Sequence, residues 1–376
     1  MPVTIRKVEG AKDIDRFLEV PFDLYRDDPN WIAPLFLERH EHLSPKRNPY
    51  FKHAEVQLFL ATRGERPVGR ISAQIDRLRL ERYGDATGQF GFLEAPDDPE
   101  VFAALFDTAA EWLKARGMRR MQGPFSFSIN EETGLLVDGF NAPPRLMMGH
   151  ALPYAGPRVE EQGFIKAMDV FAYDYDARPL PRAMAAMVSR AEASGDLDVR
   201  PLSKKNLKRD LALIVSIFND AWSSNWGFVP WTNEEIEALG NNLKLLVGED
   251  YVAIASWKGV PAAMAVSLPD INLAIRDLKG RLLPLGWAKL LWRVFARPPR
   301  AVRLPLMGVL KEHQSTPVGA ALALAVIDRI RAAHVARGTT RGELSWILED
   351  NMPMRRMIEG LGGRPYKTYR IYERGL

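Results

Sequence analysis

The fold is decided near the carboxyl end of the chain, by the stretch Glu343-Leu344-Ser345-Trp346-Ile347-Leu348-Glu349-Asp350-Asn351 and the residues that follow it. Apolar and hydroxyl side chains at 342–348 predict a strand. Asn351 offers the side chain that caps a helix over 352–361, and Gly362-Gly363 predicts the end of that helix. A strand that leads directly into a capped helix is typical of a sheet covered by helices.

Elements of the same kind surround this stretch. Residues 303–310 predict a strand, 318–337 a helix and 366–373 a last strand. Farther upstream, two apolar segments at 251–257 and 260–268 predict a hairpin, because a short turn signal separates them. The second half of the chain therefore predicts a mixed α/β sheet.

The first half has the same order of elements. A hairpin is predicted over 56–77, a strand over 88–94, a helix over 99–116, and strands over 119–123 and 165–175. The helix begins after a pair of aspartates that favour an N-cap. Each half thus predicts the same fold class, a mixed α/β (α+β) sheet.

Identical residues support a duplication. When Asp107 is set against Asp328, an offset of 221 residues, six of the 24 positions from 107 to 130 are identical, where about one or two are expected by chance. The alternative is similar composition in two unrelated α/β domains. Duplication predicts an N-terminal domain over 1–178, with an inserted loop at 131–157, and a C-terminal domain over 179–376.

Composition excludes several classes of protein. The chain has 376 residues and no cysteine, which excludes disulfide scaffolds, thiolate metal sites and cysteine nucleophiles. Six histidines without a metal-ligand spacing give no reason to expect a metal. No apolar stretch reaches the roughly 18 to 20 residues of a membrane span, and the amino end lacks a signal-peptide pattern, so we expect a cytoplasmic protein.

The stretch Glu343–Gly363 resembles the fifth strand and fourth helix of the GNAT acyltransferase superfamily, and 304–337 resembles that superfamily's acyl-CoA motif. The resemblance implies two tandem GNAT-like domains, each with a fourth and fifth strand that splay apart. Between the splayed strands lies the pantetheine arm of acyl-CoA, and a helix N-terminus meets the pyrophosphate. In the C-terminal copy, the implied acyl-CoA contacts are Leu306, Met307, Gly308, Val309, Leu310, Lys311, Gln314, Val318 and Gly319.

The chain departs from the superfamily pattern in two places. The loop over 314–319 keeps only one glycine, Gly319, and Ile358 stands where many members carry a tyrosine acid. In the N-terminal copy the corresponding loop, 94–98, is acidic and would repel phosphate. We therefore expect the C-terminal copy to bind acyl-CoA and the N-terminal copy not to.

Further segments resemble one bacterial family. These are Asn219-Asp220-Ala221-Trp222, 225–230, 269–272 and 367–372. The family includes the bacterial ceramide synthases, which transfer a long-chain acyl group from acyl-CoA to the amine of a sphingoid base. The resemblance implies this N-acyl transfer, and the absence of cysteine favours direct transfer over an enzyme thioester.

A basic amphipathic insertion, residues 279–303, favours a lipid independently. Eight basic and no acidic residues lie between Lys279 and Lys311, around an apolar segment that contains Trp287 and Trp292. This pattern predicts an interfacial helix, so we expect peripheral contact with anionic lipid through 282–297, at the inner face of the cytoplasmic membrane. The alternative is a helix packed on the core with a solvated basic rim. Nucleic acid is disfavoured, because aromatic residues are not interleaved with the charges in a groove-like pattern.

Acylation of an amine needs a base for the ammonium and an acid for the departing thiolate. We expect Glu343 or Asp270 to be the base, with His150 of the inserted loop as a third candidate, and Tyr366 to be the acid. His313 is a candidate for phosphate binding or catalysis. For each of these a structural role is the alternative. The candidate substrate-binding residues are Asn219, Trp222, Trp226 and Asn351, of which Asn351 also suits a helix cap.

Three other functions stay open at this point. A tandem GNAT-like chain also suits a small-molecule N-acetyltransferase or a tRNA-dependent aminoacyltransferase. The degenerate loop and Ile358 suit a lipid- or CoA-binding module without catalysis. Release of free thiol from acyl-CoA in the presence of a sphingoid base separates these functions from the leading one.

Overall fold

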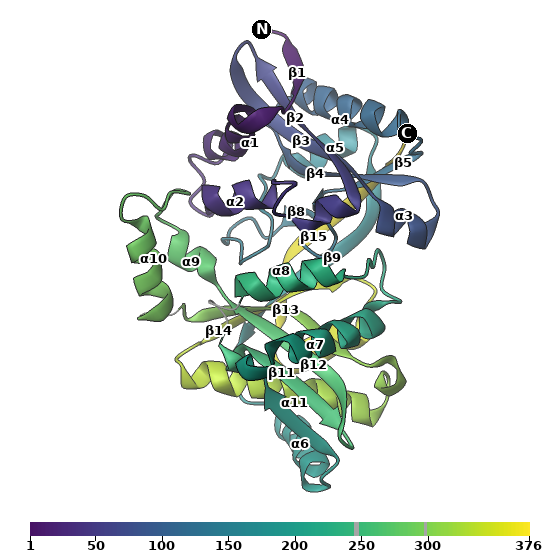
Figure 1. Cartoon of the computed structure of the whole chain (residues 1–376), viewed down its shortest axis with the longest axis vertical. Coiled ribbons are helices and arrows are strands. Elements are labelled where there is room, and N and C mark those ends of the chain that lie inside the picture. The colour runs from purple at the N-terminus through teal and green to yellow at the C-terminus, as the bar shows by residue number, and fades with distance from the viewer. Residues whose placement is uncertain (244–247, 297–298) are drawn as a thin grey trace. The chain divides into compact units, whose positions relative to one another are not determined.

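The computed structural model describes residues 1–243, 248–296 and 299–376, which form two compact units (Figure 1). Unit 1 comprises Met1–Phe171, Ile275–Leu290 and Lys367–Leu376; unit 2 comprises Ala172–Ala274 and Leu291–Tyr366. Both units are therefore assembled from segments that are distant in the sequence.

Unit 1 is built on a sheet of strand order β1-β2-β3-β4-β5-β15, in which β4 and β5 pair in parallel and the other neighbours are antiparallel. Its main strands are β1 Val3–Lys7, β2 Ala54–Arg63, β3 Arg66–Asp76, β4 Thr87–Glu94, β5 Arg120–Gly123 and part of β15 Arg364–Gly375. Short strands are β6 Phe125–Ser126, β7 Glu132–Thr133 and β8 Leu135–Asp138. Its helices are α1 Gly10–Leu24, α2 Phe36–His42, α3 Arg77–Tyr83, α4 Pro99–Lys114, α5 Ala155–Glu161 and the 3-10 helix η1 Pro49–Lys52.

Unit 2 has the strand order β14-β13-β12-β11-β10, again with a single parallel pair, β13 and β14. Its strands are β10 Leu197–Pro201, β11 Val252–Trp257, β12 Val260–Pro269, β13 Ala301–Val309 and β14 Arg341–Leu348. Its helices are α6 Arg182–Ala193, α7 Leu207–Trp222, α8 Asn233–Leu243, α11 Pro317–Ala336, α12 Met352–Gly360 and the 3-10 helices η2 Lys204–Asn206, η3 Glu249–Tyr251 and η4 Lys311–His313. Strand β9 Ile165–Asp176 and helices α9 Ile271–Ile275 and α10 Gly286–Phe295 are divided between the units.

Helices α4 and α11 each follow the first strand of the parallel pair in their unit, and each begins at a side-chain cap. Asp98 accepts a hydrogen bond from the Glu100 N–H at 3.0 Å, and Thr316 accepts one from the Gly319 N–H at 3.1 Å. Each cap satisfies an amide that the first turn leaves without a helical partner. Both helices then bury apolar side chains against the sheet of their own unit.

The mixed α/β sheet is confirmed, and both predicted hairpins form, as β2–β3 and β11–β12. Asn351 caps α12 as predicted, accepting a hydrogen bond from the Met354 N–H. Strand β10 and helix α7 are missing from the sequence-based prediction. The boundary at 178/179 between the duplicated copies stays a prediction. The compact units have other bounds, because unit 1 also contains Ile275–Leu290 and Lys367–Leu376.

Candidate active site

In unit 2 the parallel strands β13 and β14 are paired only over their first halves and then separate. They pair from Ala301 with Arg341 to Leu304 with Leu344, and the pairing ends there, although β13 continues to Val309 and β14 to Leu348. Beyond Leu304, β13 has β12 as a neighbour on one edge. The other edge is open to a ligand that can complete its hydrogen bonds.

The backbone of two residues faces this open edge. The Leu310 N–H donates to the Ala262 oxygen at 2.8 Å, and hydrogen-bonded positions alternate in an antiparallel pair. The alternation turns Gly308 toward β12 and turns Met307 and Val309 away from it. Both residues lie within the segment 306–310 that the sequence predicts to contact acyl-CoA. The carbonyl oxygen of each accepts a hydrogen bond from a side chain.

Trp222, at the end of α7, covers one of these carbonyls. Its indole N–H donates to the Met307 oxygen at 2.8 Å, and its ring meets Trp346 of β14 edge-on at 5.5 Å. The Gln314 amide covers the other, donating to the Val309 oxygen at 2.8 Å and to the Ala221 oxygen at 3.2 Å. The indole of Trp222 therefore touches both strands of the splay in this structure.

A buried polar cluster lies where the splay begins. Arg303 and Glu343 are partners in the strand register, one position before the last pair, and both are at most 2% exposed. Ser345 donates its hydroxyl to Glu343 Oε1 at 2.5 Å and accepts from Arg303 Nε at 2.8 Å. The Tyr366 hydroxyl donates to the second carboxylate oxygen, Oε2. Glu343 and Tyr366, named separately from the sequence, are thus directly bonded.

Asp270 lies at the paired end of β13. Its N–H donates to the Ala301 oxygen at 3.0 Å, and its own carbonyl oxygen accepts from the Leu273 N–H at 3.2 Å. The residue is 1% exposed. Since Ala301 is eight residues before Val309 in the strand, Asp270 lies at the paired end of β13, away from the open edge.

The loop between β13 and α11 is held in place by side chains. The Lys311 N–H donates to Asp220 Oδ2 at 2.7 Å, and the Thr316 cap fixes the first turn of α11. A Cβ on Gly319 would lie 2.1 Å from the His313 oxygen, so glycine is needed for this close approach. Val318 is partly buried at the helix start, and Lys311 is exposed beside the loop.

The remaining substrate candidates are spread along unit 2. Asn219 lies on α7 one turn before Trp222, and its buried Oδ1 accepts no hydrogen bond from the described residues. Trp226 lies in the turn after α7 and is partly buried. Asn351 has its side chain engaged as a helix cap, which favours a structural role for this residue.

In unit 1 the chain itself fills the corresponding splay. Strands β4 and β5 pair only from Thr87 to Gln89, and β6 then lies against β4. A Cβ on Gly91 would be 1.8 Å from the Phe125 oxygen. The Gln74 amide donates to the Phe125 and Phe127 oxygens at 2.8 and 3.2 Å. Strand β6 therefore occupies the edge of β4 where the splay of unit 1 begins.

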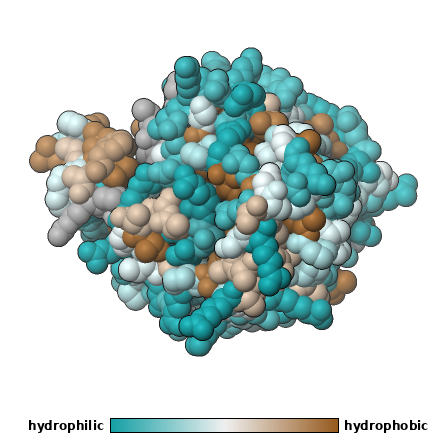
Figure 2. All heavy atoms as spheres, turned by 90° about the horizontal axis from the view of Figure 1, so that it is seen from below, coloured by the Kyte–Doolittle hydropathy of each residue, from teal (hydrophilic) through white to brown (hydrophobic). Residues whose placement is uncertain are grey.

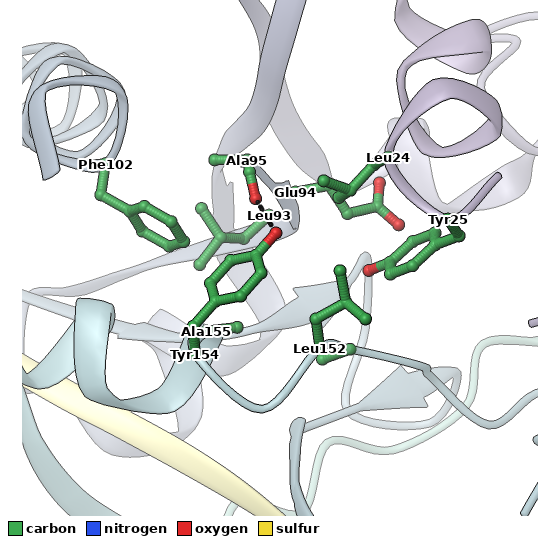
Figure 3. A pocket seen from close by; sticks show the side chains of 10 residues that line it. Leu24, Tyr25, Leu93, Glu94, Ala95, Phe102, Leu152, Tyr154 and Ala155 are labelled. Atoms are coloured by element: carbon green, nitrogen blue, oxygen red, sulfur yellow. Dashed lines mark hydrogen bonds between the residues drawn. The ribbon is translucent and has the colours of Figure 1, made fainter. Parts of the chain in front are cut away.

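Unit 1 instead has a small pocket at the carboxyl end of β4, with room for a group about the size of one water molecule (Figure 3). Its walls carry three aromatic rings, aliphatic side chains and one carboxylate. The lining residues are Leu24, Tyr25, Leu93, Glu94, Ala95, Phe102, Ala151, Leu152, Tyr154 and Ala155. Burial raises the pKa of Glu94, although Arg70 beside it acts in the opposite direction.

His150 lies next to this pocket in the sequence, with its ring buried. Nε2 is 2.7 Å from Asp28 Oδ2, and Nδ1 meets no hydrogen-bond partner among the described residues. Burial lowers the pKa of His150 even though Asp28 acts to raise it. His150 belongs to unit 1, whereas Glu343, Asp270 and Tyr366 belong to unit 2.

A second group of charges in unit 1 is missing from the sequence-based prediction. His42 Nε2 is 2.5 Å from a Glu131 oxygen, and Arg39 of the same helix pairs with Glu132. Although burial opposes it, the carboxylate of Glu131 raises the pKa of His42. The only signal in the sequence is the spacing of Arg39 and His42, which places both on one face of a helix.

In the described parts of the chain, no group of three or more His, Cys, Asp or Glu side chains is arranged to hold a metal ion. Likewise, none of the helices in residues 1–243, 248–296 and 299–376 has the length and hydropathy of a membrane span.

Comparison with solved structures gives the fold a name. The chain matches a tandem GNAT protein from the clavulanic acid biosynthesis pathway with a TM-score of 0.56 and 13% identity, covering 99% of this chain and 98% of the other. A GCN5-related N-acetyltransferase from Sphaerobacter thermophilus matches with a TM-score of 0.53 and 10% identity, over 99% and 95% of the two chains. The predicted tandem GNAT-like fold is confirmed, while identities this low carry no argument about substrate.

Curated proteins are similar to this chain over almost its whole length. No family model matches the chain. Protein YghO of Escherichia coli K12 is 43% identical over 98% of this chain and 95% of its own length. A protein named Bacterial ceramide synthase, from Caulobacter vibrioides, is 47% identical over 100% of this chain and 98% of its own length. With identity at this level from end to end, the chain belongs to the family of the bacterial ceramide synthases and has the fold of GNAT N-acyltransferases.

Proposed function

We propose that the chain transfers a long-chain acyl group from acyl-CoA directly to the amine of a sphingoid base, and that unit 2 is the copy that binds acyl-CoA. The observation that carries this proposal is the 47% identity, over the whole chain, to the protein named Bacterial ceramide synthase. Geometry supports the choice of unit 2, because its splay leaves a strand edge open whereas β6 fills the splay of unit 1.

The open edge of β13 suits the amides of a pantetheine arm. Met307 and Val309 turn their N–H groups toward this edge, where an arm lying along the strand can accept hydrogen bonds from them, whereas their carbonyl oxygens already accept from Trp222 and Gln314. Gly308 lets α7 pack closely behind the strand, since its Cβ position lies 3.1 Å from that of Ala221. Lys311, His313 and the N-terminal amides of α11, near Val318 and Gly319, offer positive charge to the pyrophosphate.

The Glu343–Tyr366 pair supplies a path for the proton. Tyr366 takes a proton from the ammonium on its phenolic oxygen as its own proton passes to Glu343, and the free amine then attacks the thioester carbonyl. When the carbon–sulfur bond breaks, the thiolate takes one proton back from the pair. The other proton that nitrogen loses goes to solvent, so the products are the amide, CoA thiol and H⁺.

The oxyanion of the tetrahedral intermediate needs a fixed donor. The N–H groups of Met307 and Val309 are candidates, because the register points them at the same open edge. A backbone donor costs no reorganisation during the reaction and gains strength away from water. Trp222, Trp226 and Asn219, on and after α7, are proposed to line the acyl side of this region.

A lipid acceptor calls for contact with a membrane, and we place that contact at α10. Six large apolar side chains in and before this helix are exposed over about half of their surface or more: Leu283, Leu285, Trp287, Leu291, Trp292 and Phe295. Figure 2 shows brown and tan side chains gathered at the left of the view, the side on which Figure 1 draws α10. Arg293 and Lys289 are on the helix, and Arg297, which belongs to the predicted contact, is outside the described residues.

Such a face matches an anionic lipid surface at the inner side of the cytoplasmic membrane, because its apolar side chains enter the interface while its cations meet headgroups. The alternative of a helix packed on the core does not suit these exposures, since none of the side chains of α10 is buried. The contact would let the acceptor reach unit 2 from a bilayer.

The activity is tested by incubating the purified protein with sphinganine and acyl-CoA thioesters of two to eighteen carbons, while free thiol and lipid product are followed. We expect thiol release that depends on sphinganine and rises with chain length. Absence of thiol release with every thioester would leave the CoA-binding module without catalysis. Release with acetyl-CoA alone would indicate a small-molecule acetyltransferase, and transfer from charged tRNA would indicate an aminoacyltransferase.

A further inference from the structure

The pocket at the carboxyl end of β4 in unit 1 has two phenol oxygens and one carboxylate in its lining, and both phenols donate their protons to backbone carbonyls. The Tyr25 hydroxyl donates its proton to the His150 carbonyl oxygen at 3.2 Å, and the Tyr154 hydroxyl donates to the Ala95 carbonyl oxygen at 2.8 Å. Each phenol has a single proton to give, so what remains toward the pocket is its oxygen lone pairs. Burial raises the pKa of Tyr154 to about 12, which keeps that proton in place at neutral pH.

Glu94 provides the third acceptor. Its Oε2 accepts a hydrogen bond from Arg70 Nε. The other oxygen, Oε1, accepts no hydrogen bond from the residues that the structure describes, and it is not fully buried, so it borders open space. In Figure 3 the Glu94 carboxylate and the Tyr25 hydroxyl point toward one another, and the Tyr154 hydroxyl points inward from the opposite wall. Glu94 is thus a buried carboxylate with one oxygen left for a ligand.

The walls around these acceptors favour a cation. The rings of Tyr25, Phe102 and Tyr154 line the pocket, and aromatic faces attract positive charge at short range. Leu24, Leu93 and Leu152 complete the lining, and such aliphatic side chains suit the carbon next to a charged head.

We propose that this pocket binds a primary ammonium group on an alkyl chain. An ammonium has three N–H donors and no acceptor, and the pocket presents three oxygen acceptors, one of them a carboxylate, in a space of about that size. A hydroxyl ligand leaves two of the acceptors without a proton, and a carboxylate ligand brings like charges together. The proposal goes beyond the proposed function, because the acyl acceptor gives its proton to Tyr366 in unit 2 whereas this pocket is a separate amine site in unit 1.

The proposal gives unit 1 a task other than CoA binding. Its splay is filled, yet it keeps a built pocket at the same end of β4. The burial that raises the pKa of Glu94 disfavours its charge when the pocket is empty, and a bound cation relieves that cost. An amine site therefore accounts for a carboxylate that Arg70 alone does not fully satisfy.

The test measures amine binding directly, by calorimetry of the full-length protein with octylamine, octanol and spermidine at pH 7.5, without acyl-CoA. We expect octylamine to bind and octanol not to, with spermidine weaker because its second and third charges enter aliphatic surroundings. Spermidine binding as tightly as octylamine identifies a polyamine as the source of the ammonium. Failure of octylamine to bind, or equal binding of octanol, overturns the proposal.

Two variants locate the site and one controls for charge. Leu152→Phe fills the pocket and leaves Glu94 with Arg70, and Glu94→Gln removes the carboxylate; each is expected to weaken octylamine binding about tenfold or more. Glu161→Gln, at an exposed acid on α5 outside the lining, should bind like the wild type. Wild-type binding by Leu152→Phe, which retains all three acceptors and the ion pair, contradicts the assignment even where Glu94→Gln fails to fold.

Thiol release separates this inference from the proposed function. If the proposed function is wrong, octylamine still binds while no thioester is cleaved with sphinganine present. If the inference is wrong, thiol release proceeds while the wild type binds no octylamine, or while Leu152→Phe binds octylamine as tightly as the wild type does.

Discussion

The hydroxyl of Tyr366 donates its hydrogen bond to the carboxylate of Glu343, which also receives the hydroxyl of Ser345. The pair lies at the point where β13 and β14 separate, since Glu343 is one residue before the last parallel rung. A buried carboxylate with a phenol between it and less buried surroundings is an arrangement that moves a proton without exposing the charge.

Tyr366→Phe is therefore expected to lower kcat for thiol release about a hundredfold, because proton transfer by a positioned side chain contributes roughly 10² or more. The KM for acyl-CoA should change less than about threefold. Steady-state rates across pH 6 to 9 measure both constants. The matched control is Tyr372→Phe, which removes another tyrosine–glutamate hydrogen bond from the same strand, to Glu160, and should retain kcat. Equal losses in the two variants would mean that Tyr366 is structural.

Trp222→Phe should strengthen the binding of CoA. The substitution keeps a ring against Trp346 but removes the N–H that occupies the Met307 carbonyl, so a pantetheine amide no longer competes for it. A gain of about threefold to tenfold in affinity is expected from one hydrogen bond of ordinary net strength, measured by calorimetry with free CoA. Trp226→Phe changes a nearby tryptophan and should leave affinity unchanged. Weaker binding by Trp222→Phe would show that the indole helps to hold CoA.

Replacing Trp287 and Trp292 together by alanine should abolish association with vesicles that contain anionic lipid. Both side chains are about half-exposed on α10, and burial of such area drives interfacial binding. Sedimentation with phosphatidylglycerol vesicles measures the bound fraction, with neutral phosphatidylcholine as the comparison. Leu37→Ala removes an exposed apolar side chain from α2 and should bind as the wild type does. Retention of vesicle binding in the double variant would remove α10 as the contact.

His334 should make the protein less stable in acid. Burial lowers its pKa to about 4, from about 6.5 in an unfolded chain, and its Nε2 is 2.8 Å from the Ser267 hydroxyl. Below pH 6.5 the unfolded state takes up a proton that the folded state refuses, so stability is complete above pH 6.5 and declines toward pH 4. Between pH 7.5 and 5 the loss from this group is about 2 kcal/mol.

Urea unfolding of the wild type and of His334→Gln at the two pH values isolates this contribution. Glutamine does not titrate, so the variant should lose about 2 kcal/mol less than the wild type on acidification. Parallel losses in the two proteins would show that His334 is already protonated, or still neutral, in both states.

Gly91→Ala should destabilise unit 1 by about 3 kcal/mol or more, because the added Cβ meets backbone and cannot be accommodated by rotating a side chain. Gly375→Ala is the matched control, since a Cβ at that position meets nothing within 4 Å. Thermal unfolding followed by circular dichroism compares the two. A Tm for Gly91→Ala within 2 °C of the control would mean that β6 is not seated against β4.

Local patterns in the sequence predict the strands, hairpins and helix caps, because each of these features depends on neighbouring residues. Asn351 and Asp98 are examples, since a cap binds an amide two or three residues away. Glu343 and Tyr366 are separated by 23 residues, and sequence reasoning names both without joining them. Their contact depends on how the strands align, which no local pattern encodes.

The features that sequence reasoning misses are those made by distant side chains. The pocket joins Tyr25, Glu94 and Tyr154, and no spacing between them carries a period. Likewise, Trp222 looks like a core tryptophan by composition, and only the register of β13 shows that its indole meets an open strand edge. Arg39 and Glu132, which are 93 residues apart in the sequence, form an ion pair.

The sheet of unit 1 includes the last ten residues of the chain, Lys367–Leu376, in which Tyr372–Gly375 pair with β5. A ribosome delivers this strand only after all of unit 2 has been made. The N-terminal part of unit 1 therefore waits through the synthesis of residues 172–366 with one edge of its sheet unpaired. Nascent chains at this stage are candidates for chaperone capture, and loss of residues 367–376 would harm the first unit rather than the second.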